Sequence, residues 1–524
     1  MDLTKIELNA EFERALDLIE KTDKNVFITG KAGTGKSTLL EYFRSITAKN
    51  VVVLAPTGVA ALQVQGETIH SFFGFKPNVT LQNIKKIGTK ESKIYKKIDT
   101  IVIDEISMVR ADLLDCIDRF LRLNGKDSLL PFGGIQMVFI GDLYQLPPVV
   151  TAKEKRIFTD HYKSPYFFDA DVFKELPLEF IELEKVYRQK DEKFIELLNQ
   201  IRNNTITEEG ISLLNSRVGA QLCQKEGEFV LYLTTLNEMA SRINQEFLDK
   251  LPGQAFKWEA LVEGRFDPTA FPTDYVLQVK PNAQVMMLNN DSKGRWVNGS
   301  LGRVIDVIGS KKGDGDVIKV QFSDNRIEYV TPFTWEVFHF KYNERVKAIE
   351  SEVVGKFTQY PLRLAWAVTI HKSQGKTFDK VIIDIGRGTF ACGQVYVALS
   401  RCTSFAGIAL KSPIKKKYIF NDWRIVKFLT NFQYQISEKE LSLEEKIKLI
   451  KKAIGQRLPI EIVYLKPNDE KSKRVIVPYD VGRFNFQKKS FWGVAAFCEK
   501  RQEDRVFRVD RILQMKVLGR RDSG

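Results

Sequence analysis

Residues 30–37 read Gly-Lys-Ala-Gly-Thr-Gly-Lys-Ser, directly after the apolar residues 26–29 and before the apolar residues 39–40. A G-x-x-x-x-G-K-S pattern between a strand and a helix is typical of a phosphate-binding loop, because glycines let backbone N–H groups face a phosphate. Lys36 would span the β- and γ-phosphates, and Ser37 would ligate Mg²⁺. The alternative is a glycine-rich turn that only caps a helix. The expected nucleotide-binding residues are Gly33, Thr34, Gly35, Lys36, Ser37 and Thr38.

Three more apolar, β-branched runs resemble the one before this loop, at residues 51–54, 101–103 and 137–140. Such runs suit strands that are buried on both faces of a parallel sheet, so the sequence predicts an α/β fold. Each run ends in polar or turn residues. Because open α/β sheets bind ligands at the carboxyl ends of their strands, we expect these ends to carry the chemistry.

Two acids follow the second of these runs. Asp104 would hold Mg²⁺, and Glu105 would take a proton from an attacking water. The alternative is two acids at a helix start, where the helix dipole favours them. Residues 141–148 (Gly-Asp-Leu-Tyr-Gln-Leu-Pro-Pro) follow the next run and place Gln145 where it would sense a γ-phosphate.

Transfer of a phosphoryl group also needs cations, because charge spreads over the phosphoryl oxygens in the transition state. Arg188, within Val-Tyr-Arg-Gln at 186–189, and Arg401, at the end of residues 394–402, are the candidates. Taken singly, each of them is also explained as a surface charge.

The composition favours a polyanionic partner. The 524 residues contain 80 Lys and Arg against 66 Asp and Glu, a net charge of +14. Nucleic acid is the first candidate, ahead of an anionic membrane surface. The five cysteines show no C-x-x-C spacing, which argues against a zinc site or a disulfide framework and favours a reducing, cytoplasmic setting. We see no leader and no apolar run of about 18 residues, so we expect neither export nor membrane insertion.

The length predicts three to five compact units, and the pattern changes along the chain. Between about residues 250 and 355, turn residues separate short alternating segments, which predicts a small β-barrel inserted into a larger domain. A charged amphipathic pattern at 433–457 predicts a connector helix, and residues 458–524 alternate as strands do.

These motifs resemble those of superfamily 1 helicases, and the chain is most similar to the Pif1 family, a 5′-to-3′ branch. Residues 131–136 (Pro-Phe-Gly-Gly-Ile-Gln) look like the Pif1 signature. The resemblance extends over roughly residues 5–432, and its motifs follow the family's order. They lie at 30–37, 66–73, 104–108, 131–136, 141–148, 367–375 and 398–401.

The resemblance implies two RecA-like domains that bind ATP and Mg²⁺ between them, with Arg188 and Arg401 as arginine fingers and Gly375 near the nucleotide. It implies translocation by a monomer on single-stranded DNA, and unwinding of forks or structured DNA such as R-loops and G-quadruplexes. The implied domains are 1A (1–180) with a 1B wedge (about 75–97), and 2A (181–432) with an SH3-like 2B insertion (about 250–355).

The family's strand-gripping motifs imply a DNA-binding set in both domains. Phe72 would stack on bases, although adjacent aromatic residues such as Phe72 and Phe73 usually belong to a core. Each histidine has a packing role as its alternative. The set comprises Thr57, Gly58, Thr68, His70 and Phe72 in the first domain, and Thr369, His371, Lys372 and Ser373 in the second.

One departure from the family lies at residues 8–12, Leu-Asn-Ala-Glu-Phe, where the family has L-N-x-E-Q. The family's glutamine reads adenine, and Phe12 has no groups for that bidentate contact. The sequence therefore predicts a looser choice of nucleotide.

Residues 458–524 resemble a WYL domain, an Sm-like β-barrel of bacterial regulators that contacts nucleic acid or nucleotide ligands. Trp492 is kept, but Gly493 and Val494 replace the tyrosine and leucine, so we expect an altered pocket. Local salt bridges are the alternative role for the arginines. The candidate anionic site consists of Arg474, Trp492, Arg508 and Arg511.

Together these features predict a cytoplasmic, nucleoid-associated bacterial DNA helicase driven by ATP. One alternative is a RecD-like or relaxase-associated superfamily 1B helicase, against which Phe132-Gly133-Gly134 argues. The other is a nucleotide-gated DNA-binding regulator in which the WYL-like part dominates.

Overall fold

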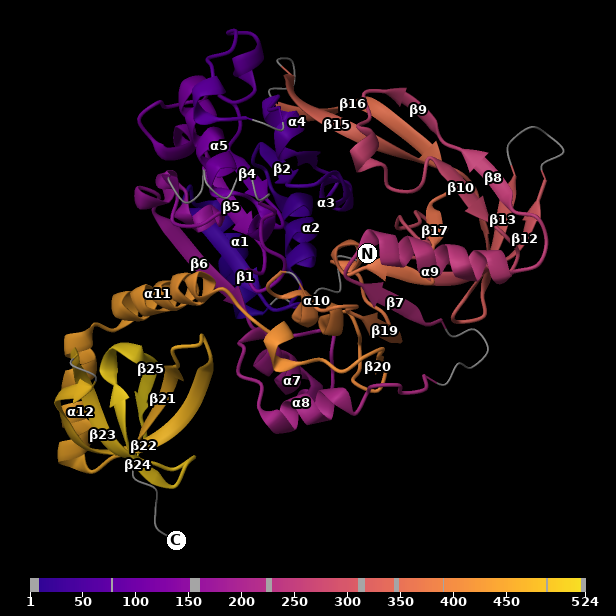
Figure 1. Cartoon of the computed structure of the whole chain (residues 1–524). Coiled ribbons are helices and arrows are strands. Elements are labelled where there is room, and N and C mark those ends of the chain that lie inside the picture. Colours follow the sequence, from indigo (N-terminus) through magenta and orange to yellow (C-terminus); the bar gives the residue numbers. More distant parts are fainter. Residues whose placement is uncertain are drawn as a thin grey trace. The chain divides into compact units, whose positions relative to one another are not determined.

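The computed structural model describes residues 9–76, 79–150, 161–222, 229–309, 316–343, 348–389, 391–486 and 489–519. The chain divides into two compact units (Figure 1). Unit 1 comprises Met1–Ile201 and Thr207–Phe420, and unit 2 comprises Arg202–Ile206 and Asn421–Gly524.

A six-stranded parallel sheet in the order β3-β2-β4-β5-β1-β6 is the core of domain 1A. The four apolar runs of the sequence form its buried strands, which confirms the predicted α/β fold. The sheet continues through β6, beyond the predicted domain boundary at residue 180. The strands are β1 (Asn25–Gly30), β2 (Val51–Ala55), β3 (Glu67–Thr68), β4 (Thr100–Ile103), β5 (Gln136–Ile140) and β6 (Leu178–Leu183).

Helices flank this sheet, and α2 starts directly at the end of the phosphate loop (Figure 1). The side chain of Asn9 accepts a hydrogen bond from the Phe12 N–H and so caps α1. The predicted 1B segment contains two 3₁₀ helices, η2 (Leu81–Asn83) and η3 (Glu91–Lys93). The domain's α-helices are α1 (Ala10–Lys21), α2 (Lys36–Ile46), α3 (Gly58–Gln63), α4 (Ile69–Phe73) and α5 (Ala111–Asn124).

Domain 2A contains a second parallel sheet, with four strands in the order β18-β7-β19-β20. Its strands are β7 (Leu231–Thr234), β18 (Ala367–Thr369), β19 (Val381–Asp384) and β20 (Ile408–Leu410). Its helices are α7 (Glu192–Arg202), α8 (Glu208–Asn215), α9 (Asn237–Lys250) and α10 (Gln394–Ser400).

The insertion in domain 2A consists of three antiparallel sheets instead of the single small barrel expected from the sequence, and it reaches Leu364 instead of ending near residue 355. The long β15–β16 hairpin extends to domain 1A, where the His339 Nδ1 atom lies 3.2 Å from a Glu67 carboxylate oxygen (Figure 1). The sheets are β14-β13-β12-β11-β17, β10-β8 and β15-β16-β9. Their strands are β8 (Phe256–Glu259), β9 (Leu261–Gly264), β10 (Val276–Val279), β11 (Gln284–Met287), β12 (Leu301–Ile308), β13 (Val317–Phe322), β14 (Ile327–Val330), β15 (Phe333–Asn343), β16 (Ala348–Gln359) and β17 (Leu362–Leu364).

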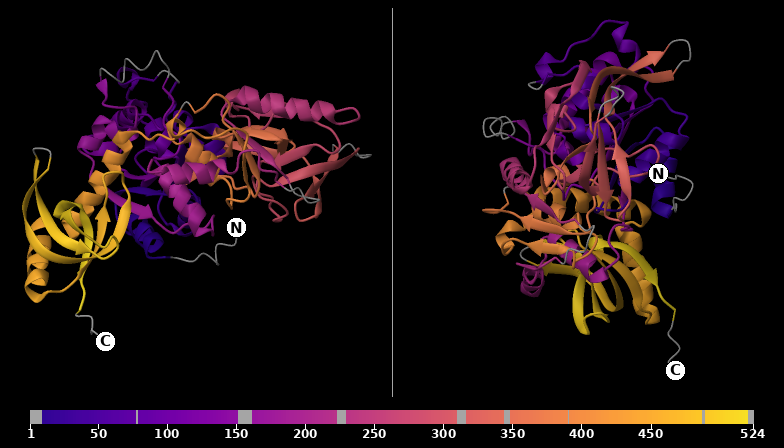
Figure 2. Two further views of the ribbon diagram at one scale, coloured as in Figure 1. Left: turned by 60° about the horizontal axis from the view of Figure 1, so that its bottom comes forward. Right: turned by 90° about the vertical axis from the view of Figure 1, so that its right-hand side faces the viewer.

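Unit 2 is a curved antiparallel sheet in the order β24-β23-β22-β21-β25, with two helices (Figure 2). Ile447, Ile450 and Ala453 of α12 lie in one buried cluster with residues of the strands. The predicted connector therefore belongs to the core of this unit, whose boundary falls at Asn421 instead of residue 433. Its elements are α11 (Trp423–Glu440), α12 (Leu443–Gln456), β21 (Ile460–Leu465), β22 (Lys471–Phe486), β23 (Lys489–Cys498), β24 (Glu503–Arg508) and β25 (Ile512–Val517).

Among the described residues, no helix combines the length and the apolar character needed to cross a membrane.

Candidate active site and DNA-binding surface

The phosphate loop lies against the segment that carries Arg188. The Gly33 carbonyl accepts a hydrogen bond of 2.9 Å from the Tyr187 N–H. Gly33 has φ +81°, and a Cβ atom there would lie only 2.6 Å from the Cβ of Arg188, so glycine is required for this approach. Lys36 Nζ donates to the carbonyl oxygens of Gly30 at 2.7 Å and Lys31 at 3.0 Å. The loop thus has the fold of a phosphate cradle, with the first turn of α2 at its end.

The two predicted arginine fingers meet at the C-terminal end of α10. Arg188 Nη1 donates to the Ser400 carbonyl at 3.0 Å. Arg401 is 1% exposed and donates from Nε to the Val397 carbonyl and from Nη2 to the Ser400 hydroxyl, both at 3.1 Å. The same helix contacts the phosphate loop, because the Ala32 N–H donates to the Tyr396 hydroxyl at 3.0 Å. The loop and both arginines therefore gather at the interface of domains 1A and 2A, where the resemblance places the nucleotide cleft.

The acids of this cleft have raised pKa values. Burial, followed by the neighbouring Glu105, raises the pKa of Asp104 to about 7, and Lys36 opposes this rise. Burial also raises the pKa of Glu105, against the attraction of Lys36 and Arg401. Burial, followed by repulsion from Arg188, lowers the pKa of Arg401 to about 9. Perturbed acids and bases that share one cleft are typical of catalytic sites.

Gln145 is positioned by a buried carboxylate. Asp142 is 0% exposed, and its Oδ2 accepts a hydrogen bond of 3.3 Å from Gln145 Nε2. The backbone of this segment packs on the start of α10, since a Cβ atom at Gly393 would lie 2.6 Å from the Gln145 carbonyl oxygen. Gln145 therefore lies at the boundary of the two domains, as a sensor of the γ-phosphate requires.

The residues predicted to hold Mg²⁺ fit that ion in chemistry. Ser37 lies exposed in the first turn of α2, and Asp104 follows β4. Hydroxyl and carboxylate oxygens are ligands that Mg²⁺ accepts, with water and substrate phosphates as the others. No group of three or more His, Cys, Asp or Glu side chains in the described parts of the chain is arranged to hold a metal. An ion here would thus depend on the phosphates for its remaining ligands.

Gly375 packs against a helix of domain 1A. Gly375 follows the 3₁₀ helix η9 (His371–Ser373), and its nearest neighbour beyond the adjacent chain is the Gln63 side chain of α3, 3.5 Å from the position of a Cβ atom. Gly375 therefore lies beside α3 of domain 1A, and its place near the nucleotide stays a prediction.

The predicted DNA-binding residues divide by exposure. Thr57 and Lys372 are exposed, while Gly58, Thr68, His70 and His371 are half-buried. Burial lowers the pKa of both His70 and His371, so both rings are neutral at pH 7 and can donate one N–H without charge. These six residues remain candidates for contact with a nucleic-acid backbone.

Three other members of that set are buried, which contradicts a direct contact with DNA. Phe72 is 1% exposed and packs edge-on against Phe73, Tyr95 and Phe340. Thr369 is 3% exposed and accepts a hydrogen bond from the Lys372 N–H. Ser373 is 0% exposed, and its hydroxyl donates to the Ile370 carbonyl at 2.7 Å. Their role is to shape the core and the loop that carry the exposed residues.

Sequence reasoning missed two cations next to this loop. Lys376 is 9% exposed, and burial, followed by repulsion from Arg363 and Lys372, lowers its pKa to about 7. Burial likewise lowers the pKa of Arg363, with Asp274 as the opposing acid. The Lys376 side chain lies against Gly299 of the insertion, so three cations gather where domain 2A meets its insertion.

Comparison with known proteins identifies the family. The family model described as PIF1-like helicase matches residues 7–211. The ATP-dependent DNA helicase Pif1 of Bdellovibrio bacteriovorus is 32% identical over 421 residues, which cover 78% of this chain and 89% of that protein. The chain belongs to the PIF1-like helicase family. It spans only 58–61% of the length of three vertebrate PIF1 relatives that it matches.

Solved structures of a Bacteroides Pif1 also resemble most of the chain. The complex with ADP-AlF4 is 37% identical with a TM-score of 0.74, and the match covers 82% of this chain and 98% of that one. The complex with ADP-AlF3 and single-stranded DNA is 36% identical with a TM-score of 0.61 and the same coverage. A second family model, the WYL domain, matches residues 445–517, which begin inside α12.

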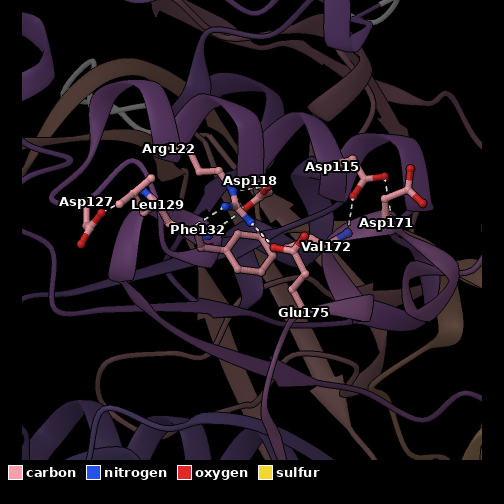
Figure 3. A network of polar contacts seen from close by, with 9 residues as sticks. All are labelled: Asp115, Asp118, Arg122, Asp127, Leu129, Phe132, Asp171, Val172 and Glu175. Atoms are coloured by element: carbon pink, nitrogen blue, oxygen red, sulfur yellow. Dashed lines mark hydrogen bonds and ion pairs between the residues drawn. The ribbon is translucent and has the colours of Figure 1, made fainter.

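The Pif1 signature has a structural role here (Figure 3). Phe132 is buried with φ +52°, a conformation that non-glycine residues rarely adopt. Asp118 of α5 holds it by accepting a hydrogen bond of 2.6 Å from the Phe132 N–H, and also pairs with Arg122 at 2.8 Å. Arg122 in turn donates to the Leu129 carbonyl. The signature therefore folds back on α5.

Phe12, which replaces the glutamine of the family, belongs to the core. It is 2% exposed, and its Cζ lies 3.0 Å from the position of a Cβ atom on Gly35. The phenyl ring packs against Gly35 of the phosphate loop and has no group that could form a hydrogen bond with a base.

The four candidate residues of the WYL-like part lie at two adjoining cavities, which share Tyr464 and Val506, and beside them. Arg474 is 6% exposed and lines a cavity of about 410 Å³ with Tyr464 and Phe507. Arg508 and Arg511 line another of about 610 Å³, and Arg508 also pairs with Asp510 at 2.6 Å. Trp492 lies 5.1 Å from the Arg483 guanidinium and lines neither cavity.

Proposed function

We propose that this chain is an ATP-dependent DNA helicase that moves 5′ to 3′ on single-stranded DNA. The observation that carries the proposal is that the phosphate loop of domain 1A contacts Arg188 and Tyr396 across the expected cleft, with Arg401 close to Glu105. Closure of such a cleft by a triphosphate moves two domains that both carry candidate DNA contacts. The Bacteroides Pif1 complex with ADP-AlF3 and single-stranded DNA supports both ligands by similarity.

The side chains of the cleft have separate tasks in hydrolysis. Lys36 leaves the carbonyls of Gly30 and Lys31 for the β- and γ-phosphates, whose charge is a stronger acceptor. Glu105, whose raised pKa makes it a better base, takes the proton of the attacking water. Gln145, fixed by Asp142, orients that water.

Arg188 and Arg401 stabilise the charge that develops on the transferred phosphoryl group. Both are already held at the end of α10, so little reorganisation is needed in the transition state. Ser37 and Asp104 would hold Mg²⁺, which supplies charge neutralisation at the phosphates when it is bound.

The DNA strand is proposed to follow the exposed Thr57 and Lys372 and the half-buried Gly58, Thr68, His70 and His371, with the buried cations nearby adding positive potential. Contacts to the phosphates explain binding without regard to sequence and predict that affinity falls as salt rises. Forks, R-loops and G-quadruplexes are proposed substrates from the resemblance to the family. Monomeric action, a cytoplasmic and nucleoid-associated location, and roles in DNA repair and recombination follow from the same resemblance.

Unwinding of partial duplexes that carry a 5′ or a 3′ tail, with and without ATP, tests this proposal. We expect ATP-dependent unwinding of the 5′-tailed substrate, and none when Glu105→Gln removes the base. Unwinding of the 3′-tailed substrate alone would overturn the polarity. ATP-dependent DNA binding without unwinding in the wild type would favour the nucleotide-gated regulator.

We also propose that the WYL-like part binds an anionic ligand. The favouring observation is Arg474, a buried cation whose Nε has no hydrogen-bond partner and which lines the cavity of about 410 Å³. Arg474 Nη1 donates to the Cys498 Sγ atom at 3.5 Å, and an anion would supply the acceptor that Nε lacks, although it would have to enter a cavity that Glu503 and Asp504 also line. Binding of inorganic phosphate or AMP to the full chain, measured by calorimetry, should be lost in Arg474→Met. Equal binding by the variant would refute the assignment.

A further inference from the structure

Gln189 joins the segment of one predicted arginine finger to the backbone around the other. It directly follows Arg188 in the chain and is 3% exposed. Its Nε2 atom donates to the Ser400 carbonyl and to the Cys402 carbonyl, both at 3.0 Å. These two carbonyls belong to the residues before and after Arg401. One amide group therefore fixes the backbone on both sides of Arg401, and the mechanism proposed above gives it no task.

Ser400, the last residue of α10, is the point at which these contacts meet. Its carbonyl oxygen has two lone pairs and accepts a second hydrogen bond, from Arg188 Nη1 at 3.0 Å. Its hydroxyl accepts from Arg401 Nη2 at 3.1 Å and donates to the Val397 carbonyl at 3.0 Å. Both arginines and Gln189 therefore bond to the same residue.

The two guanidinium groups repel each other, and the proximity of Arg188 contributes to the lowered pKa of Arg401. Groups of like charge move apart unless other contacts hold them. A lysine in place of Gln189 would add a third positive charge, and a glutamate would compete with phosphoryl oxygens for the arginines. The glutamine amide supplies N–H donors without charge, which suits a brace between two cations.

The same short segment also reaches the phosphate loop. The Tyr187 N–H donates to the Gly33 carbonyl at 2.9 Å, two residues before Gln189 bonds to the end of α10. Residues 187–189 therefore contact the phosphate loop on one side and the backbone around Arg401 on the other.

We propose that Gln189 fixes Arg188 and Arg401 relative to each other, so that both guanidinium groups reach the transferred phosphoryl group together. Gln189 is a positioning residue, because it acts through the two arginines and touches neither ATP nor the attacking water. The inference rests on the proposed ATP hydrolysis, but nucleotide binding tests it without turnover.

The variant Gln189→Leu removes both N–H donors and keeps a side chain of similar size. Loss of a whole arginine finger lowers kcat by about 10³-fold or more, and misplacement of a group by about 1 Å costs about 100-fold. We therefore expect kcat for ATP to fall about 10- to 100-fold. The KM should stay within about twofold of the wild type, because the phosphate loop holds the nucleotide in the ground state.

Equilibrium binding to the full-length chain separates the two states of the phosphoryl group. ADP with Mg²⁺ should bind to Gln189→Leu as it does to the wild type. ADP with Mg²⁺ and aluminium fluoride, which resembles the phosphoryl group during transfer, should bind about 10- to 100-fold more weakly. Equal weakening of both ligands would overturn the proposal, since it indicates a damaged phosphate loop.

Gln359→Leu is the matched control. Gln359 is also 3% exposed, and its Nε2 atom donates to the carbonyls of Trp258 and Tyr275 at 3.0 and 3.3 Å within the insertion. The control should lose a similar free energy of unfolding in urea but keep the wild-type kcat and affinity for the aluminium fluoride complex. A Gln189→Leu variant with only this loss of stability would overturn the proposal.

Gln189→Glu is the second variant, in case the leucine variant does not fold. The glutamate keeps the size and polarity of the side chain, and its carboxylate has no Nε2 donor for the two carbonyls. It should show the same selective loss of affinity for the aluminium fluoride complex, and wild-type affinity would overturn the proposal. These binding measurements stay valid if the chain fails to unwind DNA, so a failure of the proposed function is distinguishable from a failure of this inference.

Discussion

Replacement of Arg401 by methionine should make the protein more stable and catalytically inert. The pKa of Arg401 falls from 12.5 to about 9, and one pKa unit corresponds to about 1.4 kcal/mol. Because the folded-state pKa lies below the unfolded value, the charged form at pH 7 costs the folded state on the order of 5 kcal/mol. The side chain is 1% exposed, so solvent screening does not reduce this figure much.

Part of that cost is already offset by the two hydrogen bonds of Arg401 to Val397 and Ser400, each contributing about 1 kcal/mol. Methionine loses those bonds but fills much of the same volume without a charge. Apolar replacements of buried charged groups are often neutral or stabilising by about 1–4 kcal/mol. We expect Arg401→Met to raise the free energy of unfolding by about 1–3 kcal/mol.

Urea unfolding and steady-state ATP hydrolysis on the same preparation test both halves of the prediction. Loss of an arginine finger lowers kcat by about 10³-fold or more. Arg217→Met is the control, because Arg217 lies in the same domain and donates to the carbonyls of Ile408 and Ala406 at 2.7 Å. The control should be destabilised and remain active. A lower urea midpoint for Arg401→Met, or hydrolysis within tenfold of the wild type, would refute the reasoning.

Three further predictions follow from the cleft and the unit boundary. The pKa of Asp104 is raised to about 7, and only the ionised carboxylate holds Mg²⁺. The kcat/KM for ATP should therefore rise about tenfold between pH 6 and pH 8 at fixed free Mg²⁺. A flat pH profile would contradict the role of Asp104 as a Mg²⁺ ligand. A truncated chain that ends at Phe420, without unit 2, should be a folded, active ATPase with weaker DNA binding. A chain that ends at residue 456 should aggregate, because it loses the strands that cover Ile447, Ile450 and Ala453 of α12. Equal solubility of the two truncated chains, with DNA binding unchanged from the wild type, would refute this prediction. GTP and CTP should support hydrolysis at rates within about tenfold of ATP, because Phe12 presents no hydrogen-bonding group to a base, and a strong preference for ATP in the wild type would sink the idea.

The order of residues along the chain predicts those structural features that are set by residues close together in the sequence. The phosphate loop, the strands β1, β2, β4 and β5, and the acids after β4 were all predicted, because strand burial and turn chemistry leave local periodicity and glycine spacing. The family resemblance then gave the order of the domains. The insertion boundary was wrong because β17 joins its sheet only by pairing with β11, a contact that no local pattern records.

Exposure separated residues that look equivalent in the sequence. Phe72, Thr369 and Ser373 belong to predicted DNA-binding motifs, yet their side chains are buried, while Lys376 and Arg363 lie outside those motifs but beside the same loop. The burial of a side chain depends on which other elements cover it. Phe72, for example, is covered by Phe340 of the long β15–β16 hairpin. That covering is set by contacts between residues far apart in the chain.

The sequence by itself determined that the chain has a phosphate loop, two acids after a buried strand, a basic surface and the motif order of the Pif1 family. Only the tertiary structure decided that Arg188 and Tyr396 contact the loop, that Arg401 is buried at the end of α10 close to Glu105, that α12 belongs to the core of unit 2, and that Gly375 lies beside α3. The physical reason is range: backbone geometry and hydrophobic period act within a few residues, whereas a catalytic cleft joins groups such as Ala32 and Tyr396, 364 positions apart.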